Sequence, residues 1–103
     1  QRCKPVIANV MGGFSGDAVF PVALRMVYQV AGACGIPVIG CGGVTTAADC
    51  MGMILAGASA VEVGSAFFNN IGAGETICAG LPELVARYKA ERISELVGFA
   101  RKR

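Results

Sequence analysis

Short apolar runs alternate along this chain with longer amphipathic segments, and this alternation limits the folds open to it more than any other feature. Three runs are predicted to be extended, at residues 4–10, 36–41 and 60–64. The second run is apolar on both faces, which is typical of a buried parallel strand, and the third carries a single charge. Strands that alternate with helices indicate a parallel sheet covered by helices, and therefore an α/β fold.

Start and stop signals place helices between these runs. Pro21 suits the beginning of a helix over residues 22–34, which Gly35 is expected to end. Thr46 and Asp49 match the capping-box pattern and predict a second helix that runs to about residue 56.

The remaining elements complete a series of strand–helix units with short connections. Gly57 suits a left-handed C-cap, residues 75–90 are predicted as a helix interrupted by Pro82, and residues 94–99 as a short helical turn. Doubly wound sheets and (β/α)8 barrels both satisfy this order. A barrel needs about 250 residues, so a chain of 103 holds at most about its last third. Such a piece would expose sheet edges, which favours association.

Composition excludes several classes of protein. The charged fraction is 16%, too low for a disordered chain. Mean hydropathy is +0.61, and the uncharged run at residues 26–48 is long enough to span a bilayer. Glycines and Pro37 interrupt that run repeatedly, so no transmembrane helix is expected. The net charge of +2, without a basic stripe, gives no support to nucleic-acid binding.

Histidine and cysteine usage narrows the chemistry further. The chain has no histidine, which excludes Ser-His or Cys-His catalysis and a histidine-bearing zinc site within it. No metal site is expected. The five cysteines form no C-x-x-C pair: Cys3, Cys34, Cys41, Cys50 and Cys78. They are predicted to be reduced thiols that pack in the core, which indicates a cytoplasmic protein.

Glycines at the carboxyl ends of two predicted strands point to a binding site. Gly42–Gly43 follows one strand and Gly64–Ser65 follows the next. Glycine lets backbone N–H groups approach a ligand closely, and a following helix N-terminus favours an anion, as in the phosphate sites of many barrels. Ordinary tight turns are the alternative. The chain contains neither a complete dinucleotide fingerprint nor a P-loop motif.

A third glycine-rich loop spans residues 12–17, with the sequence G-G-F-S-G-D. Its glycines permit close packing against a flat ligand. The alternative is a flexible loop in which Asp17 caps the following helix. Asp49 is predicted to be a cap rather than a catalytic base, and Glu62 a charge in a barrel interior or at a sheet edge.

The motifs taken together resemble dihydroorotate dehydrogenase, most closely the NAD-linked B-type branch of class 1. The resemblance runs from about residue 4 to residue 98. It is carried by G-G-F-S-G at residues 12–16, P-V-A-L-R-M-V-Y at 21–28, P-V-I-G-C-G-G-V at 37–44, A-x-D at 47–49, L-A-G-A-S-A-V-x-V-G at 55–64 and I-S-E-L-V-G at 93–98.

This resemblance implies that residues 1–103 form the C-terminal portion of a TIM (β/α)8 barrel that holds FMN at its mouth. Residues 36–41 would be strand 7 and residues 60–64 strand 8, with helices on either side. Residues 4–10 would then belong to an excursion before the sixth helix and not to a barrel strand. By matching position, the FMN-binding residues would be Gly16, Gly42, Gly43, Gly64 and Ser65.

Two residues depart from the family pattern. Ser65 stands where the family usually has threonine, and Asp17 where it usually has proline. The cysteine base, the flavin-contacting lysine and the orotate-binding asparagines of the family would all lie upstream of Gln1. No catalytic residue is therefore assigned in this chain, and the isolated chain is expected to be inactive.

The resemblance implies that the parent enzyme oxidises (S)-dihydroorotate to orotate in de novo pyrimidine biosynthesis. In the B-type branch an FAD and [2Fe-2S] subunit relays electrons to NAD, so a homo- or hetero-oligomer is expected. Two alternatives stay open. The chain is a piece of another FMN barrel, such as dihydropyrimidine dehydrogenase, or a non-catalytic barrel fragment that associates with itself through its sheet edges.

Overall fold

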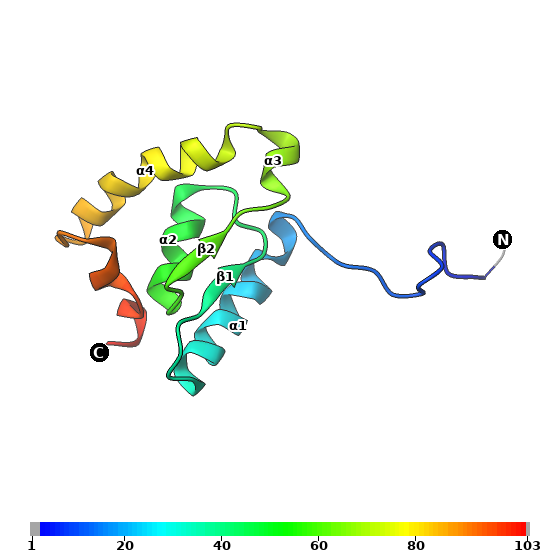
Figure 1. Ribbon diagram of the computed structural model, residues 1–103, viewed down its shortest axis with the longest axis horizontal. Helices are drawn as coiled ribbons and strands as arrows, with labels where there is room; N and C mark the ends of the chain where they lie inside the picture. The colour runs from blue at the N-terminus through cyan, green and yellow to red at the C-terminus, as the bar shows by residue number, and fades with distance from the viewer. Residues whose placement is uncertain (1–2, 103) are drawn as a thin grey trace.

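The computed structural model describes residues 3–102, with the body formed by residues 17–101 and an arm at the N-terminus (Figure 1). The elements in chain order are η1 Asp17–Val19, α1 Phe20–Ala33, β1 Ile39–Cys41, α2 Ala47–Ala56, β2 Ala60–Glu62, α3 Ala66–Asn69, α4 Ala73–Arg87, η2 Ile93–Leu96 and η3 Phe99–Arg101. The predicted α/β class is confirmed.

The sheet consists of β1 and β2, which pair in parallel across the α2 connection. Ile39 lies opposite Ala60 and Cys41 opposite Glu62. Both strands have three residues and are shorter than the predicted runs. The expectation that the first is buried on both faces was wrong, because only Gly40 of β1 is buried. The face that carries Ile39 and Cys41 is open in this chain.

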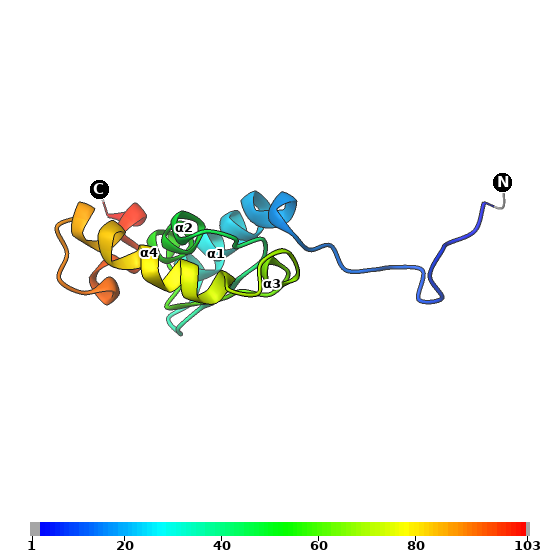
Figure 2. The same ribbon diagram turned by 90° about the horizontal axis from the view of Figure 1, so that it is seen from above.

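Helix α2 is the centre of the core. It contacts α1, β2, α4 and η3, and Met53 within it is fully buried. Helix α1 contacts β1 and helix α2 contacts β2, and Figure 2 shows α1, α2 and α4 grouped together. The buried apolar cluster is drawn mostly from α2, with contributions from its neighbours: Ala23, Val27, Val44, Cys50, Met51, Met53, Ile54, Ala56, Ala58, Ile77 and Leu96.

The capping box that begins α2 is confirmed. The Thr46 hydroxyl accepts a hydrogen bond from the Asp49 N–H at 3.1 Å, and the Asp49 carboxylate accepts one from the Thr46 N–H at 3.2 Å. The same carboxylate also accepts from the N–H and hydroxyl of Thr45. At the other end, Gly57 has a φ of 131°, beyond the left-handed helical region, and its N–H donates to the carbonyls of Met53 and Ile54.

Helix α1 differs from its prediction at both ends. It begins at Phe20, directly after η1, and the side chain of Asp17 makes no capping hydrogen bond. The expectation that Asp17 caps this helix was therefore wrong. The helix ends at Ala33 with Cys34 in an extended conformation, so the chain leaves the helix one residue before Gly35.

Helix α4 is continuous from Ala73 to Arg87, although Pro82 lies inside it. The predicted interruption was wrong. Proline removes one i→i−4 hydrogen bond, here the one to the carbonyl of Cys78, and the flanking turns and the packing against α2 maintain the helix.

Residues 4–10 form bends and turns and no strand. The N–H of Val10 donates to the carbonyl of Ile7, and Val10 has a φ of 67°. The β-branched residues of this run have no partner strand among residues 3–102, so their β-propensity is not realised. The arm extends away from the body, which gives overall dimensions of 57 × 34 × 19 Å (Figure 1).

The assignment of all five cysteines to core packing was wrong. Cys50 is buried on α2, whereas the other four are exposed: Cys3, Cys34, Cys41 and Cys78. Burial, and then the charge of Cys78, raises the pKa of the Cys50 thiol. No helix within residues 3–102 is long and apolar enough to cross a membrane.

We predict that Thr46→Ala destabilises the chain by about 1 kcal/mol, because the first turn of α2 loses its reciprocal cap. Urea unfolding followed by far-UV circular dichroism measures this change. Thr76→Ala is the matched control, since the Thr76 hydroxyl donates to the carbonyl of Gly72, the N-cap residue of α4, at 3.0 Å and satisfies no unpaired N–H of that helix. Equal effects of the two substitutions would contradict the importance of the cap.

Candidate functional site

The two predicted glycine segments lie at one edge of the sheet. Cys41 and Glu62 are paired across the strands, so the residues that follow them leave the same carboxyl edge. These residues are Gly42, Gly43, Gly64 and Ser65, which we call the glycine edge. In open and closed parallel sheets, ligands bind at the carboxyl ends of the strands.

Gly43 lies against the loop before α1. It has a φ of 71°, and a Cβ built on it would lie 2.7 Å from the carbonyl oxygen of Gly16 and 2.7 Å from the backbone nitrogen of Phe20. These are backbone atoms and cannot rotate away. The structure therefore brings Gly16 to the glycine edge, and only glycine fits at position 43.

Gly42 allows α1 to approach β1. Its φ is 128°, and a Cβ there would lie 2.8 Å from the Cβ of Ala23. Gly42 and Gly43 thus have a structural requirement that does not involve a ligand. This supports the ordinary-turn alternative for these two glycines without excluding a second role for their N–H groups.

Gly64 and Ser65 form the open half of the glycine edge. A Cβ on Gly64 would meet no atom within 4 Å, and its φ is not positive. Ser65 precedes the four-residue helix α3 but makes no side-chain capping bond. Among the turn, loop and cap hydrogen bonds of residues 3–102, none is donated by the N–H groups of Gly43, Gly64 or Ser65. No packing contact therefore explains why glycine occupies position 64.

The N-terminus of α2 is already occupied by the chain's own groups. The Asp49 carboxylate and the Thr46 hydroxyl accept hydrogen bonds there. A carboxylate at a helix N-terminus satisfies the dipole and repels a second anion. The expectation that the helix after Gly42–Gly43 adds a free anion-binding end was therefore wrong for α2.

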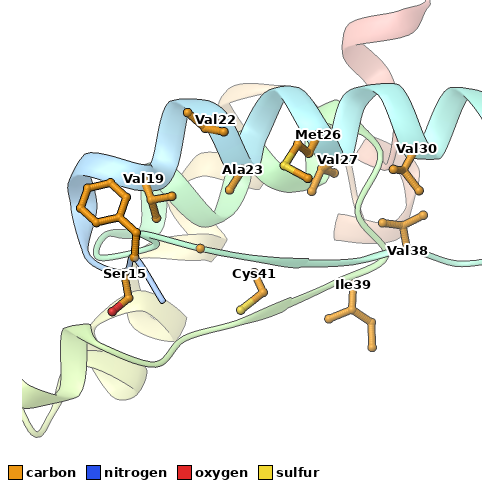
Figure 3. Close-up of a pocket in the computed structure, with 12 residues that line it drawn as sticks. Ser15, Val19, Val22, Ala23, Met26, Val27, Val30, Val38, Ile39 and Cys41 are labelled. Atoms are coloured by element: carbon orange, nitrogen blue, oxygen red, sulfur yellow. The ribbon is translucent and has the colours of Figure 1, made fainter. Parts of the chain in front are cut away.

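A thiol and a carboxylate lie next to the glycine edge, on the open face of the sheet. The Cys41 side chain points away from α1 (Figure 3) and lies opposite Glu62 in the register. Partial burial, and then the neighbouring Glu62 carboxylate, raises the pKa of the Cys41 thiol. This thiol therefore stays protonated at neutral pH and is a poor nucleophile.

An apolar groove lies between α1 and β1 and has a volume of about 530 Å³. Val27 and Val30 of α1 lie across it from Val38, and Ser15 of the arm lies at the other end (Figure 3). Phe14 also lines the groove. The groove follows the edge of β1 that β2 does not occupy. Sequence reasoning missed it. The apolar residues of α1 were the available signal, but a helix pattern does not show whether its apolar face is covered.

Residues 3–102 hold no cluster of three or more histidine, cysteine, aspartate or glutamate side chains able to bind a metal ion. The arrangement is suited to holding a ligand through backbone groups.

Comparison with known proteins identifies related sequences. A family model described as dihydroorotate dehydrogenase matches residues 1–85. The catalytic subunit of dihydroorotate dehydrogenase B (NAD(+)) from Trichlorobacter lovleyi is 51% identical over 98 residues, which are 95% of this chain and 32% of the relative. The subunit of the same name from Geotalea daltonii is 46% identical over 98 residues, again 95% of this chain and 32% of the relative.

Solved structures show the same fold. The dihydroorotate dehydrogenase of Eimeria tenella in complex with ferulenol matches with a TM-score of 0.85 and 22% sequence identity, over 90% of this chain and 26% of that one. The resemblance to the family and to its B-type branch is confirmed. The chain spans about a third of the length of the curated relatives it matches.

We predict that substitution by alanine lowers stability strongly at Gly43 and hardly at all at Gly64. Gly43→Ala should destabilise the chain by about 2 kcal/mol or more, because it adds a clash with backbone atoms to a positive φ. Gly64→Ala should change stability by less than about 0.5 kcal/mol, because open space surrounds that position. Urea unfolding of both variants measures the difference. Similar losses of stability would show that Gly64 is also required by packing.

Proposed function

We propose, since this chain belongs to the dihydroorotate dehydrogenase family, that it is the C-terminal third of a B-type catalytic subunit and forms the FMN-phosphate-binding part of its barrel. The whole enzyme would oxidise (S)-dihydroorotate to orotate in pyrimidine biosynthesis in the cytoplasm. The observation that carries the proposal is the glycine edge: Gly64 has no packing requirement for glycine, yet follows a strand directly beside Gly42–Gly43.

The architecture supports a barrel placement in which β1 is strand 7 and β2 is strand 8. The two strands are parallel and joined by a helix, as in every unit of a barrel. One edge of β1 is free and is lined by the apolar groove. A neighbouring strand and its helix from the rest of the enzyme would fill that groove and cover Val22 and Met26, which are each 58% exposed here.

The residues of the glycine edge fit a phosphate group. Backbone N–H groups of Gly42, Gly43, Gly64 and Ser65 would hold its oxygens, and the Ser65 hydroxyl would add one more donor. The open space at Gly64 gives the room that a phosphate and its approach to the backbone require. Gly16 would contact the cofactor from the loop before α1.

FMN, when bound, supplies the hydride acceptor for the oxidation. The residues of this chain bind and orient the cofactor, and Gly43 fixes the loop by its contact with Gly16. The Cys41 thiol, protonated at neutral pH, places no additional negative charge beside the phosphate. The base that takes the substrate proton would come from the preceding part of the enzyme. An FAD and iron–sulfur partner subunit would pass the electrons to NAD.

Self-association of a non-catalytic piece is the rival reading for the isolated chain. The open sheet face and the groove support it, since Ile39 is 59% exposed and Phe14 72% exposed. Size-exclusion chromatography and flavin absorbance distinguish self-association from flavin binding. A flavin-free oligomer would indicate that the isolated chain associates with itself. The function of the whole enzyme is tested by exchanging this chain into a relative.

We predict that this chain can replace the corresponding third of a relative. In the catalytic subunit from Geotalea daltonii, which matches over 98 residues, the exchange should preserve bound flavin and dihydroorotate-dependent dye reduction. Gly64→Arg in the exchanged chain should give a folded, colourless protein, because the long side chain fills the phosphate position.

Gly35→Arg is the matched control. Gly35 is also exposed, and a Cβ there likewise meets no atom within 4 Å, but it lies before β1, at the opposite end of the sheet. This variant should retain flavin and dye reduction. A folded Gly64→Arg protein with a full complement of flavin would refute the phosphate assignment. Reading the coding sequence upstream of Gln1 tests the placement separately, since the proposal requires about 200 further in-frame codons.

A further inference from the structure

The C-terminal segment Gly98–Arg101, which we call the clasp, closes the end of α2. The N–H of Gly98 donates to the carbonyl of Ile54 at 2.9 Å, and the Nε–H of Arg101 donates to the carbonyl of Ala56 at 3.2 Å. The last carbonyls of a helix have no partner within the helix; Arg101 satisfies that of Ala56, and Gly98 gives the Ile54 carbonyl, which already accepts from the Gly57 N–H, a second hydrogen bond. A cation at this end also interacts favourably with the helix dipole.

Arg101 also reaches α1. Its guanidinium carbon lies 3.9 Å from the centre of the Tyr28 ring, a cation–π contact. Its Nη1 lies where a Cβ on Gly32 would be, so the lack of a side chain at Gly32 makes the room for it. One arginine thus contacts one face of α1, at Tyr28 and Gly32, together with the end of α2.

The side chain of Arg101 is partly buried. Its Nη2 is buried and has no hydrogen-bond partner among residues 3–102, which costs free energy. The hydrogen bond from Nε to the Ala56 carbonyl and the contact of the planar group with the Tyr28 ring must offset that cost. Phe99 anchors the same segment to the end of α4, because its ring lies 6.0 Å from that of Tyr88 in an edge-on arrangement.

Helix α1 is therefore held against its neighbours at both ends. At its N-terminus, Phe20 lies against Gly43 of the glycine edge, and at its C-terminus Ala31 lies against Gly57 beside the clasp. Because α1 is one continuous helix of 14 residues, we expect a change of position at one end to reach the other.

We propose that Arg101 is a positioning residue: by clamping α1 to the C-terminus of α2, it fixes the contact between α1 and Gly43 at the glycine edge. The family model covers residues 1–85 and stops before the clasp, whereas the curated relatives match over 98 of the 103 residues. The proposal depends only on contacts within this chain and does not require that flavin binds.

Nuclear magnetic resonance of the full chain tests the link between the two ends. Arg101→Ala should shift the amide resonances of Gly43 and Phe20, and Arg101→Lys should not restore them, because lysine lacks the planar group and the Nε–H. Lys102→Ala is the control, since Lys102 is the exposed next residue. Unchanged Gly43 and Phe20 resonances in folded Arg101→Ala protein would overturn the proposal.

A double-mutant cycle tests the clamp itself. In the Arg101→Ala background, Gly32→Ala should raise the folding equilibrium constant about threefold, as alanine usually does in a helix. In the parent chain the added methyl displaces the guanidinium from Tyr28 and Ala56, so no gain is expected. An equal gain in both backgrounds would overturn the clamp.

Gly32→Ala keeps the proposal testable if Arg101→Ala does not fold. This variant should lose the upfield-shifted Nε–H resonance that a guanidinium over a tyrosine ring produces, while the chain stays folded. The Gly43 and Phe20 amides should shift in the same direction as in Arg101→Ala. A retained Nε–H resonance would show that Arg101 does not occupy the space at Gly32.

Discussion

Helix α1 can lie where it does only because glycines on the facing segments lack a side chain. A Cβ on Gly42 would lie 2.8 Å from Ala23, and one on Gly57 would lie 2.5 Å from Ala31. Together with Gly43 against Phe20, these contacts set the distance of α1 from the β1–α2 unit along its whole length. The groove beside β1, the position of the Gly16 loop and the clasp all depend on that spacing.

Local interactions explain which parts of the fold could be predicted from the sequence. The capping box at Thr46 and Asp49 forms within four residues, so its pattern is sufficient. Residues 4–10 have the β-propensity of a strand, but a strand exists only when a partner is present, and none is available among the described residues. Pro82 lies in a helix because packing of α4 on α2 outweighs its local cost. Tertiary contacts decided both outcomes.

The candidate site could be located from the sequence but not divided into its parts. Glycines that follow apolar runs predict the carboxyl edge of a sheet, and the register of β1 and β2 puts them there. The pattern does not reveal that Gly43 is required by its neighbours whereas Gly64 faces open space. That difference depends on Gly16 and Phe20, which are more than twenty residues away in the chain. The exposure of four cysteines could not be predicted for the same reason, since it depends on which faces other parts of the chain cover.

The division of the glycine edge bears on what this chain contributes. Gly42 and Gly43 serve packing first, so a substitution there would affect the fold whether or not a ligand binds. Gly64 and Ser65 have no comparable packing constraint within residues 3–102. The N-terminus of α2 is already satisfied by Asp49 and offers no free anion-binding end. Under the proposed assignment, this backbone cradle with one packed half and one open half would position the cofactor phosphate, and the acid–base chemistry would come from groups outside residues 3–102.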